Sequence, residues 1–237
     1  MGIEIQYHSG ETPLHGYFAA PESDGAAPCV LVVHEWWGCN DYVKHRADML
    51  AEEGYAAMAI DLYGEGKTAG DASEAGELMN ALLSQENAVR ERFEAALDVV
   101  KSRADVESSK IAAIGYCLGG AVVLNMARAG IDLHLVASFH GSLSTPAPAK
   151  PGTVRAQVAV FHGNDDVMIP EEQVTAFKKE MDDAGVDCHF VGYEGAMHGF
   201  TNPLATERGQ KNGMPLAYNE EADIDSWNQL LKLLSQI

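Results

Sequence analysis

Positively charged side chains are scarce in this sequence. Its 237 residues include 16 lysines and arginines against 35 aspartates and glutamates, which gives a formal net charge of −19. The few basic residues are scattered and form no tract. Nucleic acids and anionic membranes are bound through clustered positive charge, so we expect neither as a partner.

Cysteine is scarce as well, with 4 residues at positions 29, 39, 117 and 188. Their spacing includes no C-x-x-C motif, and we therefore expect no zinc site. Three of the four lie in or beside apolar runs, which is typical of free thiols in a reducing compartment. The cysteines thus favour a cytoplasmic protein.

Long apolar runs and targeting signals are also lacking. No apolar stretch has the length needed to cross a bilayer. The first six residues lead directly into strand-like alternation, so we expect no secretory signal and no membrane association. Linkers, repeats and low-complexity blocks are missing too. Because 46% apolar residues can form a large core, we expect a single domain over residues 1–237.

Strand and helix patterns alternate along most of the chain. We expect strands at residues 3–8, 14–20, 29–34, 55–60, 110–115, 133–139, 157–161 and 187–193. We expect helices at 41–53, at 71–103 with a break near Ser84, at 121–129 and at 171–184, and a closing helix with Ile224, Trp227, Leu230, Leu231 and Leu234 on its buried face. This order predicts an α/β fold with a mostly parallel central sheet, helices on both faces, and chemistry at the carboxyl ends of the strands.

The most informative segment is the hexapeptide Gly-Tyr-Cys-Leu-Gly-Gly at residues 115–120. It lies between an apolar run and a helix-like run, and it has the G-x-nucleophile-x-G pattern of a nucleophile elbow, with a thiol as the nucleophile. The glycines avoid side-chain clashes in this sharp turn, which leaves the Cys117 thiol at a helix N-terminus. The helix dipole and free amides there favour a thiolate and later an oxyanion.

Two further signals follow predicted strands. Asp165 and Asp166 come shortly after the strand at 157–161, and His198 comes after the strand at 187–193. The chain order of nucleophile, acid and histidine is that of α/β-hydrolases. We assign Asp166 as the partner that orients His198, and Asp165 as a loop residue that caps its own backbone. His198 would then pair with the Cys117 thiolate, protonate the leaving group and activate water.

The fourth signal, after the elbow, the aspartates and His198, is the loop His-Glu-Trp-Trp-Gly at residues 34–38. It comes directly after a predicted buried strand. α/β-Hydrolases contribute their second oxyanion-hole amide from this position, so we expect the amides of Leu118 and Trp36 to bind the oxyanion. Glu35 would repel an oxyanion, but near Cys117 it could hold the proton of the thiol. As residues of the substrate pocket we expect Trp36, Trp37, Tyr63 and Phe200.

These residues also have a purely structural interpretation. Cys117 could be a small buried hydrophobe, Glu35 a solvated loop residue, and the tryptophans core packing. Three other histidines, at positions 34, 140 and 162, each end an apolar strand, and we interpret them as structural. The functional interpretation is favoured because nucleophile, acid and base occur in the correct order, each at a strand end.

Taken together, these motifs resemble the dienelactone hydrolase family. The resemblance spans nearly the whole chain and depends on the segments 35–38, 115–120, 166–170 and 197–200. It implies an α/β-hydrolase fold with a minimal cap domain or none, a triad of Cys117, His198 and Asp166, and no metal or organic cofactor. It also implies that Glu35 contacts the resting thiol until substrate displaces it and the thiolate forms against His198.

The sequence departs from the dienelactone-specific pattern just after His198. Dienelactone hydrolases proper carry an arginine there that holds the substrate carboxylate, whereas this chain has Asn202, which we expect in the pocket, and Arg208 lies further on. Without the guanidinium a bidentate clamp is lost. We therefore expect a small-molecule substrate that is a neutral or apolar ester or lactone, with phosphotriesters as a further class that the thiolate can attack.

Two other functions remain to be distinguished. A DJ-1/PfpI-like redox sensor or deglycating protein also pairs a cysteine elbow with a glutamate. The later aspartate and histidine motifs favour the hydrolase over it, and the intact set of three residues argues against a binding module that has lost catalysis. The sequence leaves the oligomeric state open between monomer and homodimer.

Overall fold

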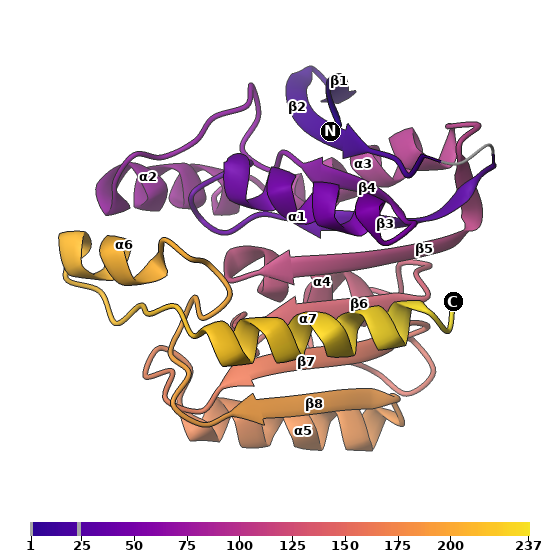
Figure 1. Ribbon diagram of the computed structural model, residues 1–237. Helices are drawn as coiled ribbons and strands as arrows, with labels where there is room; N and C mark the ends of the chain where they lie inside the picture. The colour runs from indigo at the N-terminus through magenta and orange to yellow at the C-terminus, as the bar shows by residue number, and fades with distance from the viewer. Residues whose placement is uncertain (1, 23–24) are drawn as a thin grey trace. The chain divides into compact units, whose positions relative to one another are not determined.

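The computed structural model describes residues 2–22 and 25–237, in two compact units, Met1–Ile114 and Gly115–Ile237. The strands of the first unit are β1 (Ile3–Ser9), β2 (Thr12–Ala19), β3 (Ala27–Val33), β4 (Ala56–Ile60) and most of β5 (Val106–Tyr116). They are ordered β1-β2-β4-β3-β5 (Figure 1). β1 and β2 form an antiparallel hairpin, whereas β3 and β4 run parallel with Leu31 opposite Met58.

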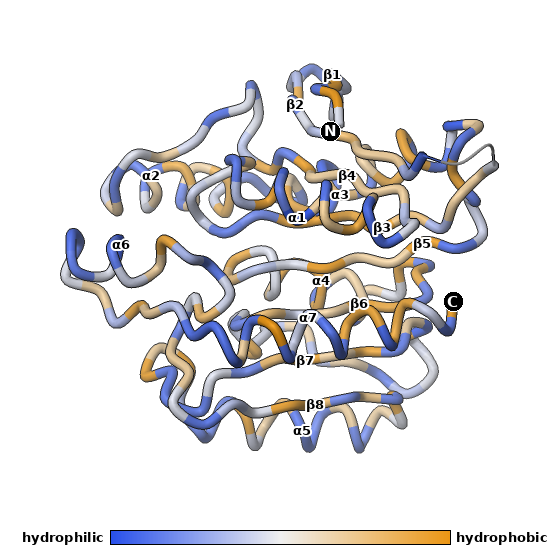
Figure 2. The backbone as a smooth tube through the Cα atoms, viewed as in Figure 1, coloured by the Kyte–Doolittle hydropathy of each residue, from blue (hydrophilic) through white to orange (hydrophobic). Residues whose placement is uncertain are grey.

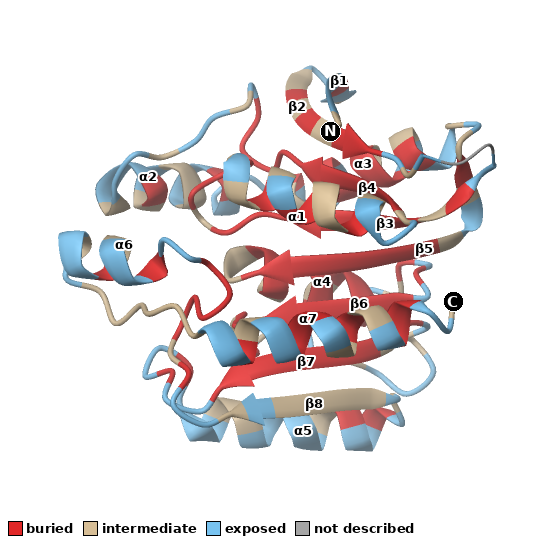
Figure 3. Cartoon of the chain, in the orientation of Figure 1, coloured by how far each residue is buried: buried red, intermediate tan, exposed pale blue. Residues whose placement is uncertain are grey.

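The first unit has three helices: α1 (Asp41–Glu52) and α3 (Ala88–Lys101), which pack on the strands, and α2 (Ala72–Leu83), which packs on α3. Asn40 caps α1 by accepting the Tyr42 amide, and Asp71 caps α2 by accepting the Glu74 amide, as short polar side chains do at helix starts. α1 lies in front of β3 and β4 in Figure 1, and α3 lies behind the strands. The core between them is apolar, and every residue of β4 is buried (Figures 2 and 3).

The second unit contains the end of β5 and three parallel strands, β6 (Leu135–Phe139), β7 (Gln157–Gly163) and β8 (Cys188–Tyr193). Its helices are α4 (Leu118–Arg128), α5 (Glu171–Ala184), α6 (Ala205–Asn212) and α7 (Glu220–Leu234). α7 crosses in front of β6 and β7, and α4 lies behind β6 (Figure 1). The register pairs Phe139 with Phe161 and Phe161 with Val191, so the carboxyl ends of the three strands lie level with one another.

An aromatic row supports this edge of the second unit. The ring of Tyr116 stacks on Phe139 at 4.8 Å between centroids, and Phe139 packs on Phe161 at 4.8 Å. All three side chains are almost fully buried. Aromatic pairs at this separation stabilise a core by about 0.5–1.5 kcal/mol beyond their buried area. The residue before Cys117 is therefore firmly anchored.

Most expected elements are present, including the break near Ser84 between α2 and α3. Three expectations are wrong. β5 begins at Val106, four residues earlier than the expected strand at 110–115, because a strand can extend into a polar, half-exposed stretch. α6 was not expected, since only Ala205 and Gly209 of its charged sequence are buried. Ile224 is 55% exposed rather than buried, because it lies opposite the stripe of α7 that contains Ser226, Leu230 and Leu233.

Within the described residues, none of the helices combines the length and apolar character that crossing a bilayer requires.

Candidate active site

Cys117 occupies a strained turn between β5 and α4. Its backbone has φ 53° and ψ −112°, a conformation that non-glycine residues rarely adopt. The Cys117 amide donates to the Phe139 carbonyl at 3.0 Å, which fixes the turn on β6. Gly115 must be glycine here, because a Cβ atom would overlap the Gly119 carbonyl. A Cβ atom on Gly120 would likewise lie 2.5 Å from the Ser138 hydroxyl.

The turn places Cys117 at the N-cap of α4. The amides of the first helical turn, Leu118 among them, have no carbonyl partner within the helix. Together with the helix dipole they attract negative charge. Cys117 and Leu118 are both half-buried, so the thiol is within reach of a small molecule. The backbone geometry is therefore suited to a thiolate and to an oxyanion beside it.

His198 connects the thiol to a carboxylate. Its Nε2 atom lies 3.1 Å from Sγ of Cys117, and its Nδ1 atom lies 2.7 Å from Oδ2 of Asp166. The three residues follow β5, β7 and β8, at the carboxyl ends of the strands. His198 and Asp166 are only 5% and 4% exposed, which shields their contacts from water.

Asp166, and not Asp165, is the carboxylate that meets His198. Its second oxygen, Oδ1, accepts the Met168 amide at 2.9 Å, and its own amide donates to Gly163. Asp165 is exposed and turned away. We expected Asp165 to cap its own backbone, but its carboxylate instead accepts the Gly195 amide of the neighbouring loop at 3.4 Å. The tight turn after β7 lets only one of the adjacent carboxylates face the imidazole.

The protonation of His198 follows from its two partners. Nδ1 donates to the Asp166 carboxylate, which can only accept, and Nε2 is left for the proton shared with Sγ. Burial alone would lower the pKa of His198, but the negative charges at Cys117 and Asp166 outweigh burial and hold it well above its ordinary value. The two contacts therefore favour the protonated form of His198.

Phe200 and Asn202 follow His198 and are both buried. The Phe200 ring packs against His140 at 5.3 Å and Tyr193 at 5.5 Å. The side chain of Asn202 accepts the Leu204 amide at 3.0 Å, and its carbonyl accepts the amide of Ala205, where α6 begins. In the second unit, both residues therefore contribute to the fold of the loop after His198. Arg208 lies on α6.

In the first unit, His34 ties together the loops that follow β3 and β4. Its Nδ1 donates to the Glu35 carbonyl at 2.5 Å, and its Nε2 accepts the Leu62 amide at 3.1 Å. Burial lowers the pKa of His34, which keeps the ring neutral and suits these opposite roles of its two nitrogens. The structural interpretation of this histidine agrees with its contacts.

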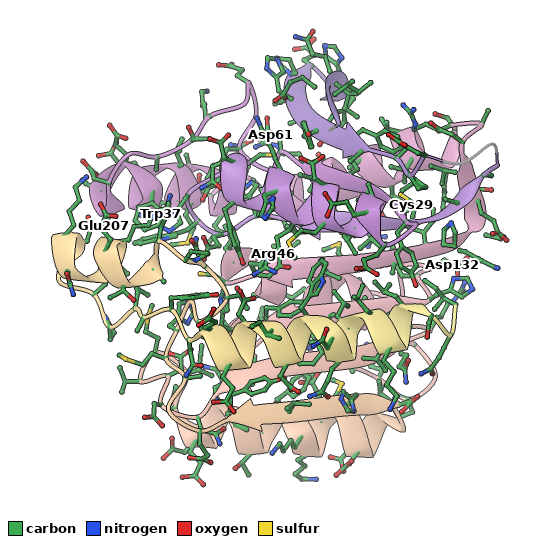
Figure 4. The ribbon with its side chains drawn as sticks, viewed as in Figure 1. Cys29, Trp37, Arg46, Asp61, Asp132 and Glu207 are labelled. Carbon is green, nitrogen blue, oxygen red and sulfur yellow. The ribbon has the colours of Figure 1, made fainter. Side chains whose placement is uncertain are left out.

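Asp61 holds the second of these loops (Figure 4). This fully buried carboxylate accepts the amides of His15, Tyr63, Gly64 and Gly66 at 2.9 to 3.1 Å. Four such donors offset the cost of burying the charge. The loop so ordered presents the Tyr63 hydroxyl, which donates to the Trp36 carbonyl at 2.8 Å.

The loop at residues 34–38 is itself well packed. The rings of Trp36 and Trp37 meet edge to face at 5.1 Å. Trp37 is 3% exposed, Trp36 is half-buried, and Glu35 is 5% exposed. Glu35 is thus not the solvated loop residue of our structural alternative.

The structure brings Cys117, Asp166 and His198 together in the second unit. Glu35, Trp36, Trp37 and Tyr63 belong to the first unit, where the contacts above join the two loops that carry them. The sequence pattern did not predict the environment of His140, whose Nε2 atom lies 2.7 Å from the Thr201 hydroxyl. Its only sequence signal was a histidine at the end of an apolar strand. Among the described residues, no group of three or more histidine, cysteine, aspartate or glutamate side chains could hold a metal ion.

Comparison with known proteins identifies the family. The model of the dienelactone hydrolase family matches residues 14–237. This chain belongs to the dienelactone hydrolase family. A protein of Aquifex aeolicus with the provisional name carboxymethylenebutenolidase is 28% identical over 209 residues, which cover 85% of this chain and 88% of the relative. The family expected from the sequence motifs is therefore confirmed.

Solved structures agree with this assignment. A dienelactone hydrolase-like promiscuous phosphotriesterase from metagenomic libraries has 34% sequence identity and a TM-score of 0.90, and the match covers 100% of this chain and 98% of that chain. A Klebsiella pneumoniae structure, provisionally named a dienelactone hydrolase, shares the fold at 24% identity and a TM-score of 0.80, with 100% and 99% covered. The α/β-hydrolase fold with its mostly parallel sheet is confirmed.

Proposed function

We propose that this protein hydrolyses neutral carboxylic esters or lactones through a thioester intermediate on Cys117. Membership of the dienelactone hydrolase family supports a hydrolase. The observation that carries the cysteine mechanism is the position of His198, with Nε2 3.1 Å from the thiol sulfur and Nδ1 2.7 Å from Asp166. A nucleophile, a base and a group that orients the base are the minimal set for acyl transfer.

In the first half of the proposed reaction, His198 holds the proton of the thiol and Sγ attacks the ester carbonyl as a thiolate. The carbonyl oxygen becomes an oxyanion, for which we assign the amide of Leu118 at the start of α4 as a donor. When the tetrahedral intermediate collapses, its carbon–oxygen bond to the leaving group breaks. The His198 proton passes to the departing alkoxide, so an alcohol leaves and the acyl group remains on Sγ.

In the second half, neutral His198 removes a proton from water, whose oxygen attacks the thioester carbonyl. Collapse of this second intermediate breaks the bond between carbon and sulfur and releases the carboxylic acid. The thiolate and the imidazolium are then restored. Asp166 keeps the imidazole in one tautomer throughout, so that Nε2 always faces the reacting atoms.

We propose that Glu35 lowers the reactivity of the Cys117 thiol before substrate binds. The resemblance of its loop to the motif of the dienelactone hydrolase family, to which the chain belongs, supports the assignment. Replacement of Glu35 by Gln should raise the rate at which iodoacetamide alkylates Cys117. An unchanged alkylation rate would remove Glu35 from this role.

The substrate class follows from charge. The chain has Asn202 where dienelactone hydrolases proper carry an arginine, and the Asn202 side-chain oxygen is occupied by the Leu204 amide. A substrate carboxylate would lack that guanidinium and would enter a protein with a formal net charge of −19. A neutral ester or lactone is therefore favoured over a carboxylated dienelactone.

Phosphotriesters are the second substrate class that we propose. They are neutral, and a thiolate next to amide donors can attack phosphorus as it attacks a carbonyl carbon. Similarity to a solved structure favours this class: the protein that is 34% identical to this chain is described as a promiscuous phosphotriesterase. Family membership and the His198 contacts also favour a hydrolase over the DJ-1/PfpI-like redox sensor.

The proposal is tested by assaying p-nitrophenyl esters, small lactones and a phosphotriester with the wild-type protein and with Cys117→Ala. We expect turnover of neutral esters by the wild-type protein and none above background by the variant. Equal turnover by both proteins would disprove the cysteine mechanism. Phosphotriester turnover by the wild-type protein that does not exceed that of Cys117→Ala would remove the second substrate class alone.

A further inference from the structure

Directly behind His198 lies a second buried histidine. His140 is the first residue after β6, it is 1% exposed, and its ring meets the ring of His198 in a T-shaped contact at 5.4 Å. Its ring also meets that of Phe200 in the same manner, at 5.3 Å. The imidazole that faces Cys117 and Asp166 is therefore backed by another ring, rather than by mobile solvent.

The backbone of His140 is held in an unusual conformation. Its φ is 41°, in the left-handed region that non-glycine residues seldom adopt. The His140 amide donates to the Phe161 carbonyl at 2.9 Å, which continues the hydrogen bonding between β6 and β7 past the strand end. Strain of about 1–3 kcal/mol at such a residue persists only where the surroundings over-determine it. The backbone just after β6 therefore sets the direction of the His140 side chain.

The side chain of His140 reaches the loop that carries His198. Nε2 of His140 lies 2.7 Å from Oγ1 of Thr201, and Thr201 is fully buried. Between His198 and Thr201 the chain turns at Gly199, whose φ is 76° and whose carbonyl accepts the Asn202 amide. The hydrogen bond between His140 and Thr201 therefore restrains the end of the turn that begins at His198.

The carbonyl of His198 is fixed as well, since it accepts the Ala217 amide at 3.2 Å. Backbone position, ring face and ring nitrogens of His198 are thus each set by a different neighbour. Asp166 holds the ring through Nδ1, and the T-shaped contact with His140 packs a second ring against it. The pair of His140 and Thr201 supplies a restraint that the triad itself lacks.

We propose that His140 and Thr201 form a buried hydrogen-bonded pair that positions His198 for proton transfer to and from Cys117. The inference rests on the proposed function and deepens it. His140 and Thr201 touch no reacting atom and act through the placement of the His198 ring. A displacement of about 1 Å in such a group can cost about 100-fold in rate, so the pair should matter although it lies outside the triad.

The decisive comparison is between Thr201→Val and Thr201→Ser. Valine keeps the shape of threonine and removes the hydroxyl, whereas serine keeps the hydroxyl. For Thr201→Val we expect kcat with p-nitrophenyl acetate to fall about tenfold or more with KM little changed, and for Thr201→Ser we expect most of kcat to be restored. Thr175→Val makes the same change on the exposed surface of α5 and should leave kcat unchanged.

The second readout is the titration of His198, followed by NMR of the imidazole nitrogens. Looser contacts with Cys117 and Asp166 would weaken the charges that raise the pKa of His198, so Thr201→Val should lower this pKa and Thr201→Ser should restore it. A role confined to stability would lower the unfolding temperature without moving the pKa in the folded protein. If Thr201→Val does not fold, His140→Asn carries the same test, because asparagine tolerates positive φ.

The inference is overturned if folded Thr201→Val has either wild-type kcat or an unchanged His198 titration. It is also overturned if Thr201→Ser is as impaired as Thr201→Val. The NMR result does not depend on turnover, so it separates this inference from the proposed function. Ester hydrolysis that survives in Cys117→Ala would disprove the proposed function. An unchanged pKa of His198 in folded Thr201→Val would instead disprove the positioning role of His140 and Thr201.

Discussion

The Nε2 atom of His198 lies 3.1 Å from the Sγ atom of Cys117, although 81 positions separate the two residues in the chain. The contact is made where the loop after β8 meets the turn after β5. It joins a strained helix N-terminus to a buried imidazole whose pKa is raised. The chemistry proposed for this protein depends on this one distance.

The first prediction concerns the selectivity of thiol alkylation. Iodoacetamide should modify Cys117 at neutral pH much faster than Cys188, which is also half-buried, because burial raises the pKa of the Cys188 thiol to about 11. Mass spectrometry of the digested protein measures both sites. The Cys188→Ala variant should keep full esterase activity, and equal labelling of the two cysteines would contradict an activated Cys117.

The second prediction separates the two adjacent aspartates. Asp166→Asn should lower kcat/KM for an ester about 100-fold or more, because the amide cannot serve as a charged acceptor for Nδ1 of His198. Asp165→Asn makes the same change on an exposed side chain and should reduce kcat/KM less than twofold or so. Steady-state kinetics decide the matter, and the opposite order of effects would move the orienting role to Asp165.

The third prediction concerns stability and pH. The pKa of His198 is raised in the folded protein, so its protonated ring stabilises the fold below the unfolded value of about 6.5. This contribution is lost as the pH rises through the higher folded pKa. The unfolding temperature of the wild-type protein, relative to that of His198→Gln, should therefore decrease as the pH is raised from about 6 to about 10.

A control makes the pH experiment specific. His8 is exposed on β1, and His8→Gln should follow the wild-type protein at every pH. Asp166→Asn removes one of the charges that raise the His198 pKa, so it should weaken the pH dependence. A constant stability difference between wild-type protein and His198→Gln over this range would show that the His198 pKa is not raised.

The fourth prediction concerns the glycines. Gly115→Ala should destabilise the protein by about 3 kcal/mol or prevent folding, because its Cβ atom would overlap backbone atoms of Gly119. Gly76→Ala is the matched substitution within α2, where a Cβ atom would meet nothing within 4 Å. It should stabilise the protein by about 0.5–1 kcal/mol. Urea unfolding measures both, and a well-tolerated Gly115→Ala would refute the close approach at the elbow.

The amino-acid sequence alone was sufficient to predict the class of the fold and the chain order of nucleophile, acid and histidine. Solid apolar strands alternating with amphipathic helices leave a parallel sheet as the arrangement that buries both faces of each strand. The requirement for glycine at position 115 is equally local, because a Cβ atom there would overlap Gly119, four positions along the chain. Such signals depend on neighbours in the chain and can therefore be read from it.

Local pattern was insufficient where the deciding contact lies far along the chain. Ile224 has the spacing of a buried residue, and only the packing of α7 leaves it exposed. α6 lacks an apolar stripe, and the hydroxyl of its Thr206 accepts the amide of Tyr218, 12 positions further along the chain. The elements that failed prediction are those whose environment is made by distant segments.

Contacts between elements determine which aspartate faces His198, and they place the ring of His140 against the ring of His198. Asp165 and Asp166 are chemically identical, and only the turn after β7, closed by the Met168 amide, directs one carboxylate inward. His140 meets Thr201 across 61 positions because β6 and the loop after β8 end at the same edge. Sequence spacing specifies side chains along one element, whereas contacts between elements depend on strand register and on the turns that follow each strand.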